Sequence, residues 1–422
     1  MRILHVNKFL YRRGGAESYM LDLAAIQQAA GHAVEFFAMK HPQNLPSRYE
    51  QHFPGNVELE PMPASLLGKA QGAGRLLFSP SALLGMSRVV RDFKPDVVHL
   101  HNIYHQLSPS ILRPLISVPT VMTLHDYKLA CPTYRFLDKG EICEACLGGN
   151  FRKALVRRCN RGSVAASGLN ALEMRLHMTF GAYEPVQLFL CPSRFLAGKM
   201  REAGVFPDRM RHLPHFIETA GVDHKLQPGG GAVYAGRLSH EKGVDVLIEA
   251  ASMAGVHVDV AGEGPEMDSL KRLAVKLADG LVTFHGRISL AEVRELLRAG
   301  AVAALPARWY ENQPLSVLDA YACGVPVVGS NLGGIPELIE DRVDGYLIPP
   351  DDPAELGSRL RSITDSAGGA YEMGLMGRRK VEDQFSVERH LAGIDGAYAD
   401  AAAGRRQVET SSLGGSKPPA QG

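Results

Sequence analysis

The sequence predicts an α/β protein built from two doubly wound domains that face each other across a cleft. Three observations lead to this expectation. The chain has 422 residues, which is too long for one ordinary hydrophobic core and indicates two or three domains. Short apolar runs alternate with helical patterns in both halves, as in parallel sheets built from βαβ units. The composition, with 45% hydrophobic and 22% charged residues, is typical of a globular protein.

Five short apolar runs mark the strands expected in the first half. They occupy residues 3–7, 34–39, 97–101, 120–125 and 186–191. A helical pattern over residues 16–30 connects the first two runs, and Gly31 ends it. Because strands and helices alternate, we expect one parallel sheet in this half.

Two segments interrupt this alternation. Residues 41–80 are rich in Pro, Gly and Ser and are expected to be irregular, before a basic helical stretch that ends near Phe93. Residues 127–165 are polar and contain four cysteines, and we expect them to fold as an insertion followed by a helix to about Tyr183. We assign the first domain to residues 1–195.

The second half shows the alternation more regularly. Its expected strands occupy residues 232–235, 256–261, 281–285, 301–305 and 325–329. These runs and the helical patterns between them predict a second domain over residues 196–384, with helices from Pro353 onward. Residues 404–422 are rich in Gly, Ser, Pro and Gln and lack apolar periodicity, which predicts a disordered tail.

Targeting and membrane signals in the sequence limit the cellular compartment that we expect for the protein. No stretch of 18 or more apolar residues appears, and the start MRILHVNKF lacks the apolar core and cleavage site of a signal peptide. We therefore expect a cytoplasmic protein whose six cysteines stay reduced.

The net charge of +1 hides an asymmetry between the two halves. Residues 1–190 carry 21 Lys and Arg against 14 Asp and Glu, whereas the remainder carries 25 against 31. The segment FRKALVRRCNRG places five of these cations within ten residues: Arg152, Lys153, Arg157, Arg158 and Arg161. They indicate an anionic partner, such as the inner face of a membrane or a lipid phosphate, or they are simply solvated surface charges. Nucleic acid is not an expected partner.

The loop after the first strand, KFLYRRGGAES, places Gly14 and Gly15 directly before a helix. Two glycines let backbone N–H groups approach a phosphate or a sugar, and a helix N-terminus favours negative charge. The loop departs from the G-x-G-x-x-G fingerprint of nicotinamide dehydrogenases, so it argues against that class of enzyme.

The segment AGRLSHEKG follows an expected strand and offers Arg237 and Lys242 at the carboxyl end of a sheet, where ligands bind in open α/β domains. A departing nucleoside diphosphate accumulates negative charge. Two preorganised cations can stabilise that charge without a metal ion.

The segment ENQPLSVLDAYACGVPVV adds a helix N-terminus to this edge. Pro314 suits the first helical position, so Leu315 and Ser316 can present free backbone N–H groups to a ligand. Glu311 lies in the loop before the helix, and Asp319 lies about one and a half turns further on.

These segments together resemble glycosyltransferase family 4, whose members retain the anomeric configuration and have the GT-B fold of two Rossmann-like domains. GRLSHEKG is similar to the family's phosphate-binding Arg/Lys element. ENQPLSVLDAYACGVPVV is similar to its motif of two acidic residues separated by seven others. The resemblance implies an acceptor-binding domain over residues 1–195, a nucleotide-sugar domain over residues 196–384, and a helix over residues 385–403 that crosses back to the first domain.

The resemblance also implies roles for positions in the second half. Arg237 and Lys242 would bind the donor diphosphate, and Glu311 would contact the hydroxyls of the donor sugar. Asp319 would hold the ribose, although the family usually has Glu there. The family often has Gly where this chain has Pro314. No divalent metal or other cofactor is expected in catalysis.

In the first half, Gly15 corresponds to the family's glycine loop near the reacting sugar. His125 in MTLHDY corresponds to a histidine at the end of a central strand, beside the donor sugar, and completes the expected catalytic set with Glu311 and the two cations. His99 and His101 in VVHLHN either line the same cleft or pack inside the domain.

The cysteines of the insertion have the spacing C-x11-C-x2-C-x12-C over Cys131, Cys143, Cys146 and Cys159. Four thiolates at this density suit a structural Zn²⁺ ion, although only one Cys-x-x-Cys is present. The alternative is a set of reduced thiols packed in the insertion.

The expected function is therefore transfer of a sugar from a nucleotide-sugar donor to a hydroxyl of a saccharide or lipid-linked acceptor, in surface polysaccharide or glycan assembly. A nucleotide-sugar epimerase of the same fold and a non-catalytic nucleotide-sugar-binding protein remain as alternatives. A glycosidase would need a water-accessible acid/base pair and would leave the cations without a role.

Overall fold

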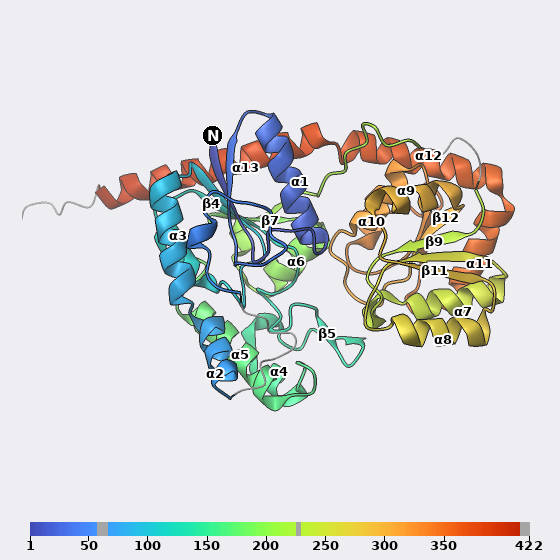
Figure 1. Cartoon of the computed structure of the whole chain (residues 1–422), viewed down its shortest axis with the longest axis horizontal. Helices are drawn as coiled ribbons and strands as arrows, with labels where there is room; N and C mark the ends of the chain where they lie inside the picture. Colours follow the sequence, from blue (N-terminus) through green and yellow to red (C-terminus); the bar gives the residue numbers. More distant parts are fainter. Residues whose placement is uncertain (57–65, 225–228, 414–422) are drawn as a thin grey trace, which may run out of the picture.

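The computed structural model describes residues 1–56, 66–224 and 229–413. It consists of two α/β domains that lie side by side, with long helices at the C-terminal end of the chain running along both (Figure 1). Each domain contains a six-stranded parallel sheet, as predicted.

The sheet of the N-terminal domain has the strand order β2-β1-β3-β4-β7-β8. Its strands are β1 (Arg2–Val6), β2 (Ala33–Phe37), β3 (Val97–Leu100), β4 (Thr120–Thr123), β7 (Leu188–Cys191) and β8 (Met210–His212). The order reverses between β1 and β3, which is where ligands bind in doubly wound sheets. The parallel register sets His5 of β1 beside His99 of β3.

Helices pack around this sheet through apolar side chains that are almost fully buried. They are α1 (Gly15–Ala29), α2 (Leu66–Leu77), α3 (Pro80–Phe93), α5 (Val164–Thr179) and α6 (Arg194–Glu202). The expectation that residues 41–80 are irregular is wrong for α2, because residues 66–77 contain no proline that would interrupt a helix.

The expected boundary at residue 195 is also wrong. Both α6 and β8 belong to the N-terminal domain, and β8 pairs in parallel with β7 through Cys191 and His212. The strand escaped prediction because it is short and contains Arg211 and His212, which break an apolar run.

The cysteine-containing segment 127–165 forms an excursion from the end of β4. It contains the short hairpin of β5 (Leu137–Asp138) and β6 (Glu141–Ile142), followed by α4 (Arg152–Arg157). Tyr127, Leu129 and Phe136 of this segment join the main core of the domain, whereas Cys146 and Phe151 belong to a small separate cluster against α5.

The sheet of the C-terminal domain has the order β11-β10-β9-β12-β13-β14. Its strands are β9 (Ala232–Ala235), β10 (Val258–Ala261), β11 (Val282–Gly286), β12 (Val302–Leu305), β13 (Val327–Ser330) and β14 (Gly345–Ile348). Five lie at the expected positions. The sixth, β14, was not predicted, because it is a four-residue edge strand that starts at a glycine.

Helices of this domain surround the sheet and enclose two apolar clusters. They are α7 (Val244–Ala254), α8 (Met267–Leu277), α9 (Leu290–Ala299), α10 (Leu315–Ala322), α11 (Pro353–Asp365) and α12 (Ala367–Gln384). The order reverses between β9 and β12, so the loops after these two strands flank the ligand-binding edge.

The last helix, α13 (Val387–Leu413), runs back over the N-terminal domain (Figure 1). It buries Ile394, Ala397 and Tyr398 in a cluster that includes Ile3 and Leu23 of that domain. The disordered tail expected from residue 404 is therefore corrected: the helix continues to Leu413, and residues 414–422 lie outside the described part of the chain. None of the described helices is both long enough and apolar enough to cross a bilayer.

Candidate active site

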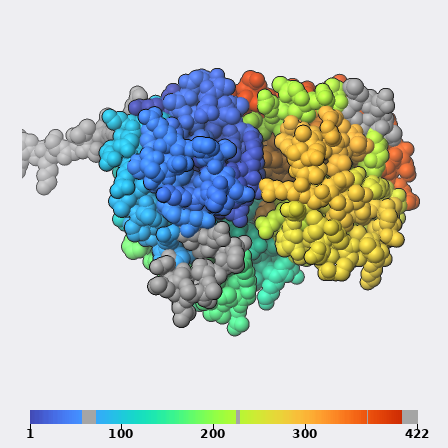
Figure 2. All heavy atoms as spheres, viewed as in Figure 1, coloured from blue at the N-terminus to red at the C-terminus, as the bar shows by residue number. Residues whose placement is uncertain are grey.

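The space-filling view shows a hollow between the two domains (Figure 2). In the C-terminal domain, Lys242 follows β9 and Glu311 follows β12. Lys242 Nζ donates a hydrogen bond to Glu311 Oε1 at 2.5 Å and lies 5.1 Å from the centroid of the Trp309 ring. Glu311 is 6% exposed, so this contact pairs a buried carboxylate with the predicted phosphate-binding cation.

Glycines hold the Glu311 loop in position. Gly333 has φ of +64°, and a Cβ added to Gly334 would lie 1.7 Å from the carbonyl oxygen of Asn312. The Gly334 N–H donates to the Glu311 carbonyl at 2.7 Å. Only glycine permits this approach, so the turn at Gly333 and Gly334 supports Glu311 by packing against its backbone.

The N-termini of two helices meet across the interface between the domains. Helix α1 is preceded by Gly14, and helix α10 begins at Leu315 after Pro314. A Cβ added to Gly15 would lie 3.7 Å from Leu315 Cδ1. Since each helix N-terminus carries a partial positive charge, this point favours an anion. The structure thus brings together the two predicted backbone sites.

The loop after Glu311 contacts the strand end that carries His125. Asn312 Nδ2 donates to the carbonyl of Leu124 at 3.0 Å, and Gln313 Oε1 accepts from the backbone N–H of His215 at 2.6 Å. The His215 and His125 rings stack with centroids 5.5 Å apart. The predicted catalytic residues of the two domains therefore share one site.

His125 is half-buried and belongs to a cluster of rings. Its Nε2 lies 3.0 Å from His101 Nδ1, and its ring packs edge-on against Tyr19. Burial lowers the pKa of His125 to about 3, so the side chain is neutral near pH 7. The sequence left open whether His99 and His101 line the cleft or pack inside the domain. Both are fully buried, so they pack inside the domain.

Asp126, which follows His125, is half-buried near two lysines. Burial raises its pKa to about 6, against the opposing effects of the Lys128 backbone N–H, which donates to Oδ1 at 2.9 Å, and of the charges of Lys8 and Lys128. Burial also lowers the pKa of Lys8, which the carboxylate of Asp126 partly offsets. The N-terminal wall of the site thus carries its own titratable pair.

Arg237 is exposed in the loop after β9. No hydrogen bond or ion pair is formed by its side chain within the described residues, whereas its carbonyl accepts from the Tyr234 hydroxyl at 2.9 Å. The backbone is fixed and the guanidinium is available to a ligand.

Asp319 does not stand free. Arg294 donates to its Oδ1 from Nη2 at 2.9 Å and from Nε at 3.2 Å. Burial raises the pKa of Asp319, and the neighbouring guanidinium opposes that rise. Ser316 lies half-buried in the first turn of the same helix.

The four cysteines of the insertion gather in one region, as free thiols. Burial and the other three thiols together raise the pKa of Cys146 to about 12, and burial with its neighbours raises that of Cys159 to about 11. Within the described residues, however, no three of these sulfurs lie within 4.8 Å of one another. The sulfurs are thus farther apart than the ligands of a formed Zn²⁺ site, which favours the alternative of reduced thiols packed in the insertion.

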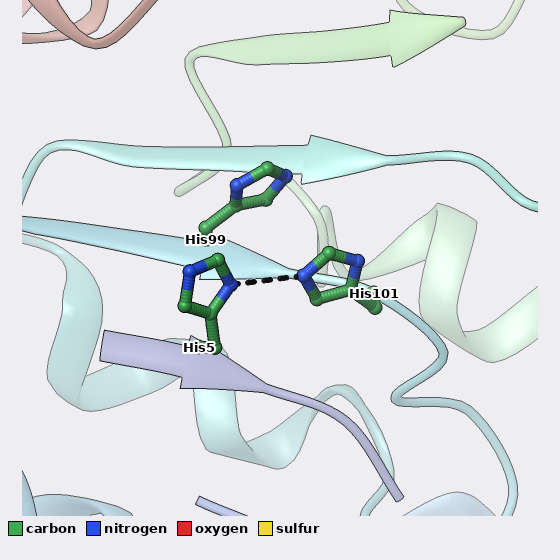
Figure 3. A group of neighbouring side chains, drawn as sticks. All are labelled: His5, His99 and His101. Carbon is green, nitrogen blue, oxygen red and sulfur yellow. Dashed lines mark hydrogen bonds between the residues drawn. The ribbon is translucent and has the colours of Figure 1, made fainter. Parts of the chain in front are cut away.

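The three imidazoles of His5, His99 and His101 do meet at metal-ligand distances (Figure 3). They do not suit a cation, because every ring nitrogen already has a hydrogen-bond partner. The cluster forms a hydrogen-bond network instead.

Sequence reasoning missed the residues that join the domains. Asn312 and Gln313 stand beside Glu311 in the same motif, and that adjacency was the available signal. Arg294, which pairs with Asp319, had no such signal, because it lies on α9, in a different segment of the chain.

Comparison with known proteins places this geometry in a class. Residues 14–215 match the family model described as glycosyl transferase 4-like domain, and residues 230–366 match that described as glycosyl transferases group 1. Together the two matches span most of the chain. The protein belongs to the glycosyltransferases with the GT-B fold, and the gap between the matches agrees with a domain boundary after β8.

Individual relatives are enzymes of several specificities. The chain is 26% identical to alpha-maltose-1-phosphate synthase of Mycobacterium tuberculosis, over 88% of this chain and 92% of that protein. It is 26% identical to D-inositol 3-phosphate glycosyltransferase of Geodermatophilus obscurus, over 92% and 85%. A match of 32% identity to glycogen synthase of M. tuberculosis spans 42% of this chain and only 44% of that enzyme.

Solved structures share the fold. Sucrose-phosphate synthase of Thermosynechococcus elongatus superposes with a TM-score of 0.72 at 19% identity, covering 96% of this chain and 99% of that one. HepE of Anabaena in complex with UDP superposes with a TM-score of 0.65 at 18% identity, covering 95% and 100%. These identities support the fold alone.

Proposed function

We propose that this glycosyltransferase moves a sugar, with retention of configuration, from a nucleoside diphosphate donor to a hydroxyl of a saccharide or lipid-linked acceptor. The observation that carries the proposal is the meeting of the α1 and α10 N-termini, at Gly15 and Leu315, beside the pair of Lys242 and Glu311. Relatives named for UDP and UDP-glucose complexes support a donor of this class.

The electrostatics of the site suit a diphosphate leaving group. The guanidinium of Arg237 is exposed, and the ammonium of Lys242 is paired with Glu311. A diphosphate would compete with the carboxylate for Lys242 and would release Glu311 to accept hydrogen bonds from sugar hydroxyls. Two cations and two helix N-termini supply positive charge, so the proposed transfer needs no divalent metal.

In the proposed reaction the acceptor oxygen attacks the anomeric carbon from the face that the diphosphate leaves. The carbon–oxygen bond to the phosphate breaks, and its electron pair stays on the phosphate oxygen. The proton of the acceptor hydroxyl moves to that phosphate, so the products are a glycoside of unchanged anomeric configuration and the nucleoside diphosphate. Asp319 would hold the ribose through the oxygen that Arg294 leaves free.

The experiment is a screen of nucleotide sugars, first by thermal shift and then by release of nucleoside diphosphate with acceptor mixtures. The anomeric configuration of the product is read by NMR coupling constants, with and without EDTA. Retention in EDTA is the expected result. Epimer formation from donor alone would identify the epimerase alternative instead, and binding without turnover would identify the non-catalytic one.

We also propose that α4 and its flanks bring the protein to an anionic membrane surface. Arg152, Lys153 and Arg158 of this segment are exposed, and Arg157, which is also exposed, donates to Asp138 at 2.7 Å. Leu155 and Val156 on the same helix are 40% and 79% exposed. Cations beside exposed apolar side chains are typical of helices that bind a membrane surface reversibly.

Sedimentation with vesicles tests this second proposal. Binding to anionic vesicles that exceeds binding to neutral ones at low salt, and that falls as salt is raised, is expected. The variant Arg152→Glu/Lys153→Glu should lose the difference, while Arg272→Glu on the exposed surface of α8 should keep it. Equal binding to both kinds of vesicle would reject the proposal.

A further inference from the structure

A continuous row of hydrogen-bonded side chains leads from the interior of the N-terminal domain to His125. Gln27 Oε1 lies 2.7 Å from His5 Nε2, and His5 Nδ1 lies 3.1 Å from His101 Nε2. His101 Nδ1 then lies 3.0 Å from His125 Nε2. Figure 3 shows the middle link, between His5 on β1 and His101 just after β3.

Every histidine in this row is neutral near pH 7. Burial lowers the pKa of His5 to about 4 and that of His125 to about 3. Burial and the neighbouring imidazoles lower the pKa of His101 well below its usual value. A neutral imidazole has one N–H donor and one bare nitrogen acceptor, so each link of the row dictates the next.

The direction follows from Gln27. Its carbonyl oxygen can only accept, so His5 carries its proton on Nε2 and its bare Nδ1 accepts from His101 Nε2–H. His101 Nδ1 is then bare and accepts from His125 Nε2–H. The remaining nitrogen, His125 Nδ1, has no proton. All three rings adopt the Nε2–H form that a free histidine side chain also prefers.

A second row fixes which end of the Gln27 amide faces His5. Gln27 Nε2 donates to the Tyr398 hydroxyl at 3.1 Å, and that hydroxyl lies 2.8 Å from His99 Nδ1. His99 Nε2 lies 2.7 Å from Thr123 Oγ1. With Gln27 as donor, Tyr398 donates to a bare Nδ1, and His99 Nε2–H donates to Thr123.

This second row ends on a group that can only accept. Thr123 contacts the hydroxyl of Tyr19, which lies 2.9 Å from His390 Nε2. His390 Nδ1 lies 2.7 Å from the carbonyl of Pro214. Because a carbonyl oxygen has no proton, His390 must carry its proton on Nδ1 and accept from Tyr19. The same direction of donation then runs back to Gln27.

We propose that Gln27, His5 and His101 are positioning residues that hold neutral His125 in its Nε2–H tautomer, with Nδ1 bare. The bare nitrogen accepts a hydrogen bond from a hydroxyl of the bound substrate and cannot donate one to a phosphate. This ligand assignment rests on the proposed function, whereas the tautomer does not. His125 Nδ1 is open to such a ligand, since none of the described residues supplies it with a partner.

The direct test is NMR of the full chain labelled with ¹⁵N-histidine, with the His125 signals assigned from a His125→Gln variant. Two-bond couplings from the ring protons identify the protonated nitrogen. The expected result is a proton on Nε2 and none on Nδ1, from pH 7 down to pH 5.5. A proton on Nδ1 would overturn the proposal, whether or not the protein transfers sugar.

Two variants at one position test the row itself. His5→Leu removes the acceptor for His101 Nε2–H. His101 should then change to its Nδ1–H tautomer and donate to His125 Nε2, so that His125 shifts toward the Nδ1–H form. His5→Asn retains an amide oxygen near the former Nδ1 and should keep the wild-type tautomer. Transferase activity should fall about tenfold or more in His5→Leu only, as for other residues that orient a site histidine.

The outcomes are distinguishable. Unchanged His125 tautomers in both His5 variants would reject the role of the row. The expected NMR changes in a protein that turns over no donor would uphold the row and reject the proposed function. If His5→Leu fails to fold, the His125 tautomer in the wild type and in His5→Asn still tests the proposal.

Discussion

At the scale of single residues, the site contains an ion pair between two of the groups that are predicted to bind the donor. Lys242 and Glu311 neutralise each other, although both are predicted to face the donor. Taking one partner away leaves a buried charge without compensation, which destabilises a protein by several kcal/mol. The ion pair therefore stabilises a charged site, and in the proposed reaction a diphosphate would take over the lysine.

Arg237 and Lys242 should be separable by mutation. Arg237→Ala removes an exposed guanidinium and should lower the transfer rate on the order of 10²-fold, with an unchanged melting temperature. Lys242→Ala should lower the rate similarly and also lower the melting temperature, because Glu311 loses its partner. Lys271→Ala, an exposed cation on α8, serves as the control. Near-normal rates in both site variants would reject the diphosphate assignment.

The buried histidines should make the protein sensitive to acid. The pKa values of His5 and His390 fall to about 4 and that of His125 to about 3, so these groups stabilise the fold above the unfolded pKa of about 6.5. That contribution is lost as the pH falls from 6.5 through 4, by about 1.4 kcal/mol per histidine and pH unit. Asp126, with a pKa raised to about 6, has the opposite sign, as do Asp319 and Glu35, whose pKa values burial also raises, but the buried histidines outnumber them.

Urea unfolding at pH 7.5, 6.0 and 5.0 measures this dependence. The free energy of unfolding should fall as the pH is lowered over that range. In the His390→Asn variant this free energy should fall less steeply than in the wild type. A free energy that does not change between pH 7.5 and 5.0 would contradict the predicted neutrality of the cluster.

At the scale of elements, the structure shows what a sequence pattern can and cannot supply. The runs at 97–101 and 232–235 gave strands, because buried parallel strands are almost purely apolar. β8 contains polar residues and β14 begins with glycine. Each is a strand because it pairs with the exposed edge of a neighbouring strand, β7 or β13. α13 extends to Leu413 through a segment whose composition predicts disorder.

The site divides in the same way. Motif spacing located Lys242 and Glu311, since both follow strands at one sheet edge. The hydrogen-bond network behind His125 could not be located. Its members come from β1, from β3 and the residue after it, and from α13, which only the tertiary fold brings together. The pairing of Arg294 with Asp319 likewise depends on how α9 packs against α10.

The insertion offers a prediction of its own. Its four thiols are gathered but not at zinc-ligand spacing, so purified protein should carry no zinc above background and should bind none tightly. Elemental analysis of protein prepared without chelator checks this, beside a Cys143→Ser/Cys146→Ser variant. One equivalent of zinc that disappears in the variant would restore the metal site predicted from the sequence.

At the scale of the whole molecule, the domains are joined by specific polar contacts. Glu337 of the C-terminal domain accepts from the backbone N–H groups of Arg194 at 2.8 Å and Phe195 at 2.6 Å, at the start of α6. Tyr310 donates to Glu144 of the insertion at 2.7 Å. These contacts hold the domains close together around the site.

Glu337→Ala should loosen this arrangement, because it removes a carboxylate that caps a helix across the interface. We expect a larger radius of gyration by small-angle X-ray scattering and a loss of stability of about 1 kcal/mol. Glu340→Ala, an exposed neighbour on the same loop, should change neither. Identical scattering from both variants would show that Glu337 does not hold the domains.

The path of α13 has a consequence for how such enzymes can be recombined. Tyr398 and His390 reach into the interior of the N-terminal domain, where they bond to Gln27, His99 and Tyr19. A chimera that joins this N-terminal half to the C-terminal half of a relative would import a foreign α13 and leave those polar groups mismatched. A functional hybrid needs a second junction, between α12 and α13, so that the first half keeps its own last helix.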